Sequence, residues 1–500
     1  MAKKANTSGR KPSAAATTAA LLGVFAAAHL VYYILGIRFD DTSLLWYWQF
    51  LDPELLRDRL LESVFYLHSQ PPLFNLFLGA ALKVSAGQPR AVFHGAFVAF
   101  GVTLYLSLFW LQVRLGVTRR VAAATSAFFL LSPSFVLYEH WLFYTFPLAA
   151  VMTLATLLFY EAAIRRRTWA YLAFFAAAFV LCGTRHIFHL AYYLLAAAAL
   201  ALACRGARRK VVLAAAAPFV ILLSFYVKNA VVFREFGLSS WSGMNLWQMT
   251  GFFLHADERE HLTEAGELSP VATIPTFSDW SLYPSEYEEA DHPGEAEALR
   301  RIYKSTGPPN YNYRGYITVA REYGRDSRVV LRRYPATYFR AQLRSWFMLF
   351  RSSSDYINGV RFLDETGNFS RLEAWNEAFD RAVYGKIHFN PDATGLLSRF
   401  GWKLPPFTLY LYLALGVPLL AYYAFRRASR RAAPEESLAA RARRWTLGYV
   451  FFNIAYVVLV TNLFSWAENN RTRFIIDPLV VAVLGLFVQH YIVWASRRKG

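Results

Sequence analysis

The stretch "FYLHSQPPLFNLFLG" at residues 65–79 decides how the chain is threaded through a membrane. It is apolar, but it contains His68 and a pair of prolines, Pro71 and Pro72. The apolar run from Pro71 to Ala86 would form a helix of roughly 24 Å, shorter than the roughly 30 Å hydrocarbon core of a bilayer. Because proline suits the first turn of a helix and not its interior, we expect an interfacial or re-entrant helix that does not cross.

Long apolar segments occupy much of the chain of 500 residues, of which 56% are hydrophobic and 17% charged. Such blocks are typical of an all-α polytopic membrane protein. About ten segments approach the length of roughly 20 residues that a spanning helix needs. We place them at 17–37, 91–113, 121–138, 145–162, 168–183, 187–204, 211–228, 405–424, 445–464 and 474–494. The polar N-terminus and the first segment resemble a retained signal anchor.

Basic loops test this path, because cytoplasmic loops of membrane proteins carry an excess of Lys and Arg. If Pro71–Ala86 does not span and the N-terminus is cytoplasmic, five basic segments share the cytoplasmic side. They are Arg114/Arg119/Arg120, "RRR" at 165–167, "RGARRK" at 205–210, the 426–444 linker and the C-terminal "RRK". A spanning Pro71–Ala86 would move all five outside. The net charge of +19 therefore reflects membrane orientation, and nucleic-acid binding is not expected.

Three regions follow from this topology. Residues 1–228 form an N-terminal transmembrane catalytic module with a first outer loop at 38–90, and residues 405–500 form C-terminal transmembrane helices. Between them, 229–404 is a smaller polar region outside the cytoplasm. Within it, "YFRAQLRSWFMLFR" at 338–351 has the pattern of an amphipathic surface helix. The two cysteines indicate neither a disulfide framework nor a thiol metal site.

Ionisable residues near membrane spans are costly, and here they gather toward the outer face. They are Asp40 and Asp41, His68, Arg90, Glu139 and His140, Arg185, His186 and His189, and Arg471, Arg473 and Asp477. Each has a structural alternative. The acids at 40 and 41 could cap a helix that begins at Thr42 or Ser43, and His68 could bond to backbone. Glu139 could pair with an arginine, while Arg185 and Arg473 could reach lipid headgroups.

Taken together, these residues predict one site with two chemical capacities. A carboxylate at the membrane boundary can act as general base for a hydroxyl or amine. Nearby arginines and a histidine can hold a lipid phosphate and stabilise the charge that grows on it as it leaves. Transfer of a sugar from a polyprenyl phosphate needs both.

The motifs that carry these residues resemble those of the C-superfamily (GT-C) polytopic glycosyltransferases, near the protein O-mannosyltransferases and aminoarabinose transferases. The matching stretches are "FDD" at 39–41, "HSQPPLFNLFLG" at 68–79 with Arg90 after it, "SPSFVLYEHWLFYTFPLA" at 132–149 and "ENNRTRFIIDPL" at 468–479. The resemblance is clearest over about 20–200 and 445–495. Residues 229–404 resemble no part of that family and are expected to recognise the acceptor.

The resemblance implies an inverting glycosyltransferase (a hexosyl or pentosyl transferase) with its active site on the extracytoplasmic face, in a bacterial inner or plasma membrane. It implies that Asp40 is the general base, with Asp41 as the alternative, and that Glu139 is a second acid. It assigns contacts with the donor phosphate to His68, Arg185, Arg471 and Arg473. The expected partners are a polyprenyl-phosphate sugar, membrane lipid, and a glycan, lipid or protein acceptor.

Two other functions remain open at this point. A transporter or flippase for a lipid-linked or anionic substrate would need polar groups near the bilayer midplane and often an internal repeat; the midportions here are Ala, Leu, Phe and Val, and no repeat is visible. A structural scaffold would leave the outer charges unused. No cofactor is expected; a divalent cation between Asp40 and Glu139 is an open alternative that no ligand spacing requires.

Overall fold

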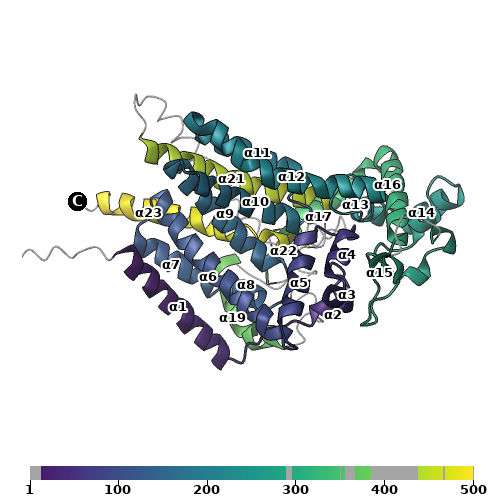
Figure 1. Cartoon of the computed structure of the whole chain (residues 1–500), viewed down its shortest axis with the longest axis horizontal. Coiled ribbons are helices and arrows are strands. Elements are labelled where there is room, and N and C mark those ends of the chain that lie inside the picture. Colours follow the sequence, from purple (N-terminus) through teal and green to yellow (C-terminus); the bar gives the residue numbers. More distant parts are fainter. Residues whose placement is uncertain are drawn as a thin grey trace, which may run out of the picture.

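The computed structural model describes residues 13–288, 296–349, 351–354, 366–384, 437–465 and 468–498, and these are helical throughout their regular parts (Figure 1). The β-structure in this part of the chain is limited to two isolated bridges, Asp40–Trp141 and Tyr303–Pro309. The described part of the chain is therefore α-helical, as its long apolar segments predicted.

Six helices in the described residues are long and apolar enough to cross a membrane. They are α1 (Ala14–Ile34), α6 (Pro89–Leu115), α9 (Thr145–Arg165), α12 (Arg208–Phe233), α21 (Leu438–Phe464) and α23 (Asp477–Arg498). They lie side by side along the long direction of the molecule (Figure 1). This confirms an α-helical membrane protein.

The expected number of ten spans is not reached in the described residues. α10 (Thr168–Thr184) has 17 residues and α11 (Leu190–Ala203) has 14, so as helices they are about 26 and 21 Å long, shorter than the hydrocarbon core. The expected span at 405–424 lies outside the described residues.

The segment expected to span at 121–138 is broken into α7 (Arg119–Leu130) and α8 (Pro133–Glu139), which meet at 61°. The break has a local cause. Ser132 caps α8 by accepting a hydrogen bond from the backbone N–H of Phe135, and Pro133 is the first residue of the new helix. Because the residue before a proline disfavours helical backbone angles, α7 ends here. The bend turns α8 so that Glu139 is buried inside the protein.

The opening stretch forms the short helix α5 (Pro72–Val84) of 13 residues, about 20 Å long, which is too short to span. Pro71 precedes it and Pro72 is its first residue, as expected. The side chain of Asn75 accepts a hydrogen bond from the N–H of Leu51 (2.8 Å) and donates one to the carbonyl of Gln49 (3.0 Å). α5 is therefore fastened to the first outer loop, whose other helices are α2 (Ser43–Trp46), α3 (Pro53–Asp58) and α4 (Leu60–Phe65).

The basic ends of the helices gather at one end of the molecule, as the topology predicted. Arg114, near the end of α6, contacts Glu161 of α9 at 2.8 Å, and its carbonyl accepts a hydrogen bond from Arg443 of α21. At the start of α7, Arg119 donates to Thr17 of α1 and Thr118 donates to Gln489 of α23. The first turn of α1 and the C-terminal end of α23 lie at this end, on the left of Figure 1.

The opposite end carries a polar body with its own hydrophobic core, here called the outer domain (residues 239–288 and 296–334). Its helices are α13 (Ser242–Met249), α14 (Ala256–Glu264), α15 (Glu297–Arg300) and α16 (Gly315–Arg333). Its core is rich in aromatic residues, among them Trp241, Trp247 and Trp280. The chain returns toward the membrane helices through α17 (Pro335–Leu349), which covers most of the expected surface helix. Phe339 and Leu343 of α17 are exposed, as a lipid-facing stripe requires.

The topology predicts different labelling of two exposed positions. A cysteine replacing Ser285 in the outer domain should react with a membrane-impermeant maleimide on intact cells. A cysteine replacing Arg209 at the start of α12 should react only after the membrane is permeabilised. The native Cys182 and Cys204 are buried and provide an unlabelled background. Labelling of the Arg209 variant in intact cells would overturn the orientation.

Candidate functional site

Asp40 lies where the first outer loop meets the turn after α8. Its backbone N–H donates to the carbonyl of His140 (2.7 Å), and its carbonyl accepts from the N–H of Leu142 (2.8 Å). Its carboxylate oxygen Oδ1 accepts from the N–H (2.9 Å) and the hydroxyl (2.6 Å) of Thr42. Asp40 is therefore a buried, oriented carboxylate.

Asp41 has a different environment. Its Oδ1 lies 2.7 Å from Nε of Arg90 at the start of α6, and the arginine side chain is 61% exposed. A solvated ion pair of this kind contributes little to stability. Of the two adjacent acids, Asp40 is the one held inside the protein.

Glu139 is fully buried at the end of α8 and points between α1 and α6. Nε2 of His29, within α1, lies 3.1 Å from its Oε2. The arginine partner considered for Glu139 is thus replaced by a histidine. No aligned hydrogen bond reaches either carboxylate oxygen from the described residues. A carboxylate in such a place is costly unless it is paired or protonated.

Gly101 of α6 provides the space for this carboxylate. A methyl group at Gly101 would lie 1.9 Å from Oε1 of Glu139 and 3.1 Å from the ring of Phe25. Two further imidazoles lie near His29: the rings of His29 and His140 are 6.2 Å apart, and those of His94 and His140 are 5.7 Å apart. Sequence analysis did not select His29 or His94. A lone histidine within an apolar span is a costly placement and was the available signal.

Aromatic rings connect Asp40 to the arginines. Asp40 forms a parallel bridge with Trp141, whose ring stacks on Phe143 at 4.6 Å. The guanidinium of Arg471, in the short helix α22 (Asn469–Arg473), lies 4.5 Å from the centre of the Phe143 ring. A chain of neighbouring residues therefore runs from the backbone of Asp40, through Trp141 and Phe143, to the guanidinium of Arg471.

Arg185 joins Arg471 at the next ring, Tyr144, from which the two guanidinium carbons lie 5.3 and 5.7 Å. Arg185 follows α10 directly and donates to the hydroxyl of Thr472 (2.7 Å). Arg471 forms an ion pair with Glu468 and a long hydrogen bond (3.4 Å) with Thr145. Both arginine side chains are buried.

Arg185 and Arg471 are here called the arginine pair, and Arg185 has buried N–H groups without acceptors in the described residues. Among the described residues, Nε and Nη1 of Arg185 have no hydrogen-bond partner although both atoms are buried. Nδ1 of the adjacent His186 is also buried without a hydrogen-bond partner among these residues. Buried donors without acceptors are costly, and guanidinium groups bind carboxylate and phosphate through parallel N–H groups. The arrangement suits an anion.

Arg473 has a structural set of contacts. Its Nε donates to Asp477 (3.0 Å), its Nη1 donates to the carbonyls of Leu349 and Arg351, and its Nη2 donates to Ser353. Leu349 is the last residue of α17, and Arg351 follows it two positions later. Arg473 thus fastens α17 to α22, and a phosphate contact would have to replace one of these bonds.

His68 is likewise engaged by protein. Its Nδ1 lies 2.7 Å from the hydroxyl of Ser240 and its Nε2 lies 2.9 Å from the carbonyl of Asn312. Both partners belong to the outer domain. The predicted phosphate role of His68 and Arg473 stays a prediction. The bond of His68 to a backbone carbonyl matches its structural alternative. Arg473 is buried and bonded to protein groups, so the alternative of a lipid-headgroup contact does not describe it.

A cation site is not visible in the described residues, where no group of three or more His, Cys, Asp or Glu side chains could hold a metal ion. The candidate site consists of Asp40, Trp141, Phe143, Tyr144 and the arginine pair. Glu139 and its histidines adjoin this site at His140, whose carbonyl accepts the N–H of Asp40. Sequence analysis selected the acids and the arginines, and it missed the aromatic residues between them.

The packing around Glu139 predicts a difference between two glycines of α6. Gly101→Ala should lower the free energy of unfolding by about 1–3 kcal/mol, because the added methyl group overpacks a filled site. Gly95→Ala is the control, since nothing lies within 4 Å of its added methyl group, and it should leave stability unchanged or slightly raised. Thermal unfolding of the purified protein in detergent compares the two; equal melting temperatures would contradict the packing described.

Comparison of the chain with models of protein families, with curated proteins and with solved structures finds no match. The function of the chain is therefore inferred from the geometry of the candidate site.

Proposed function

We propose that the chain is an integral membrane glycosyltransferase of the GT-C type, acting at the extracytoplasmic face of a bacterial inner membrane. It transfers a sugar from a polyprenyl-phosphate donor to a glycan, lipid or protein acceptor. The observation that supports this most is the arginine pair, buried at the outer ends of the membrane helices with unsatisfied N–H groups on Arg185. A phosphate on a membrane-embedded tail fits such a site.

The proposed reaction is a direct displacement at the anomeric carbon. The acceptor oxygen or nitrogen forms the new bond, and the bond between the anomeric carbon and the phosphate oxygen breaks with its electron pair moving to the phosphate. Asp40 takes the acceptor proton. Arg185 and Arg471 stabilise the charge on the departing polyprenyl phosphate. Displacement from the opposite side inverts the anomeric configuration.

Replacing each acid of the first loop by asparagine tests which of the two is the general base. Asp40→Asn should reduce transfer by at least about 100-fold, the usual contribution of a general base, because the amide cannot accept the proton. Asp41→Asn should reduce it far less, since Asp41 pairs with the exposed Arg90. Transfer from a polyprenyl-phosphate sugar is measured in proteoliposomes. The reverse order of activities would move the base to Asp41.

The arginine pair is tested through donor affinity. Arg185→Gln should raise the KM for the donor by about 10-fold or more, because a charge-assisted bond to phosphate is lost. Arg59→Gln is the matched control on the same face, where Arg59 is 53% exposed and lies 3.8 Å from Glu62. An unchanged KM in Arg185→Gln would favour a headgroup contact or a structural role for this arginine.

The product formed distinguishes a transferase from the alternative of a transporter or flippase. A transporter moves the lipid-linked substrate across the bilayer without breaking the bond to phosphate. Release of polyprenyl phosphate together with a new glycosidic bond, lost in Asp40→Asn, supports the transferase. Translocation of the intact lipid by both wild type and Asp40→Asn would support the transporter instead.

A further inference from the structure

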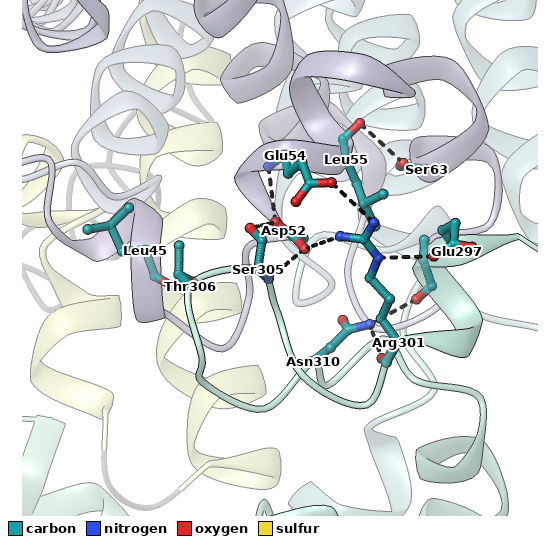
Figure 2. Close-up of polar contacts among 11 residues, drawn as sticks. Leu45, Asp52, Glu54, Leu55, Ser63, Glu297, Arg301, Ser305, Thr306 and Asn310 are labelled. Carbon is teal, nitrogen blue, oxygen red and sulfur yellow. Dashed lines mark hydrogen bonds and ion pairs between the residues drawn. The ribbon is translucent and has the colours of Figure 1, made fainter.

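A hairpin of the outer domain lies on the first outer loop, far from it in sequence. It runs from Arg301 to Asn310 and closes at the bridge between Tyr303 and Pro309. Figure 2 shows its contacts. The N–H (2.8 Å) and hydroxyl (2.6 Å) of Ser305 donate to the carboxylate of Asp52, and the hydroxyl of Thr306 donates to the carbonyl of Leu45 (2.5 Å).

The base of this hairpin is fixed by a network of ion pairs. The guanidinium of Arg301 lies 3.2 Å from Asp52, 3.2 Å from Glu54 and 3.0 Å from Glu297 (Figure 2). Asp52 is also the N-cap of α3, because it accepts the N–H of Glu54. The hairpin is therefore held in one place against the loop.

Between these two attachments, Lys304 points into the protein. Its ammonium nitrogen donates to the backbone carbonyl of Tyr47 at 2.7 Å, and the residue is 3% exposed. Burying an ammonium group is costly unless it is hydrogen-bonded and paired with an opposite charge. Burial lowers the pKa of Lys304 to about 7, against the opposing charge of Asp52.

The carbonyl that Lys304 holds belongs to a residue that packs on the aromatic rings of the candidate site. The ring of Tyr47 lies 4.5 Å from Phe143 and 5.9 Å from Trp141. Phe143 in turn carries the guanidinium of Arg471 on its face. Lys304 is thus linked to Arg471 through three contacts: its bond to Tyr47, the packing of Tyr47 on Phe143, and the guanidinium of Arg471 on the Phe143 ring.

We propose that Lys304 is a positioning residue for the anion site, by which the outer-domain hairpin holds Tyr47 and hence the Phe143 ring under Arg471. This inference rests on the proposed function, and it adds that donor binding requires the hairpin to be seated on the first outer loop. The outer domain then contributes to the donor site as well as to acceptor recognition.

A matched pair of variants separates positioning from simple attachment. Lys304→Met removes the bond to Tyr47 with little change in side-chain volume. Arg321→Met is the control: Arg321 of α16 also links the outer domain to the membrane helices, through Glu235 (2.6 Å) and the carbonyl of Phe233 (2.6 Å), but away from Tyr47. Both are compared as full-length protein in nanodiscs.

Lys304→Met should raise the KM for a polyprenyl-phosphate sugar about five- to tenfold and change kcat less than twofold. Arg321→Met should leave the KM within twofold. An unchanged KM in Lys304→Met, or an equal rise in both variants, would overturn the proposal. If Lys304→Met does not fold, Ser305→Ala loosens the same hairpin more mildly and should raise the KM in the same direction.

A pH profile provides a second readout. Since the pKa of Lys304 is lowered to about 7, its bond to Tyr47 is charge-assisted below that pH and weakens as the pH rises through it. The charged group that acts on Lys304 is Asp52, whose carboxylate is also paired with Arg301. Donor affinity should fall between pH 6 and 8.5 in wild type, and this dependence should be lost in Lys304→Arg, which stays charged. A persistent dependence in Lys304→Arg would contradict the assignment.

Amide hydrogen exchange of residues 43–51 tests the positioning without any donor. Exchange in this segment should accelerate in Lys304→Met and not in Arg321→Met. If wild type transfers no sugar from any polyprenyl phosphate, the proposed function fails, and exchange alone then decides the role of Lys304. Equal protection of the segment in wild type and Lys304→Met would refute it.

Discussion

The pairing of the loop after α1 with the turn after α8 is the constraint on which the candidate site depends. Asp40 exchanges backbone hydrogen bonds with the turn after α8, at His140 and Leu142, and the hydroxyl of Ser43 adds a bond to the carbonyl of Leu142. These bonds bring the mouth of the first helix against a turn about one hundred residues later in the chain. They place the backbone of Asp40 beside that of Trp141, whose ring stacks on Phe143, and the guanidinium of Arg471 lies over the Phe143 ring. Without this pairing, the loop that carries Asp40 would not be fixed to the turn that leads to Phe143 and Arg471.

The charged residues near the candidate site differ in how well protein partners compensate their charge. The guanidinium of Arg473 donates to Asp477 and to the carbonyls of Leu349 and Arg351. Asp41 forms an ion pair with Arg90, whose side chain is largely exposed. Arg185 differs because two of its buried nitrogens meet no acceptor in the described residues. A buried guanidinium with unused donors is stable only if its surroundings supply negative charge. The unsatisfied donors of Arg185 therefore favour an anionic ligand at this position, independently of the resemblance of the motifs.

Much of the fold was predictable because it depends on local properties. The length of the 71–86 segment and its two prolines predicted α5, and the basic loops predicted which helix ends lie together. The break between α7 and α8 was missed because Pro133 lies within an apolar run, and hydropathy does not register the turn that Ser132 caps. For the site, residue type identified Arg185, Arg471 and Arg473 alike. The partner of Arg473 four residues later, Asp477, was a readable sign of its structural role. Lys304 could not be predicted, since its contact with Tyr47 joins residues 257 positions apart.

The central claim is that the arginine pair binds the phosphate of a lipid. A cryo-EM structure of the full-length protein in nanodiscs with added polyprenyl phosphate tests it most directly. The account predicts phosphate density within hydrogen-bond distance of Nε or Nη1 of Arg185, above the ring of Tyr144, with the tail running between membrane helices. Phosphate bound elsewhere, with Arg185 unchanged and its donors facing protein alone, would contradict it.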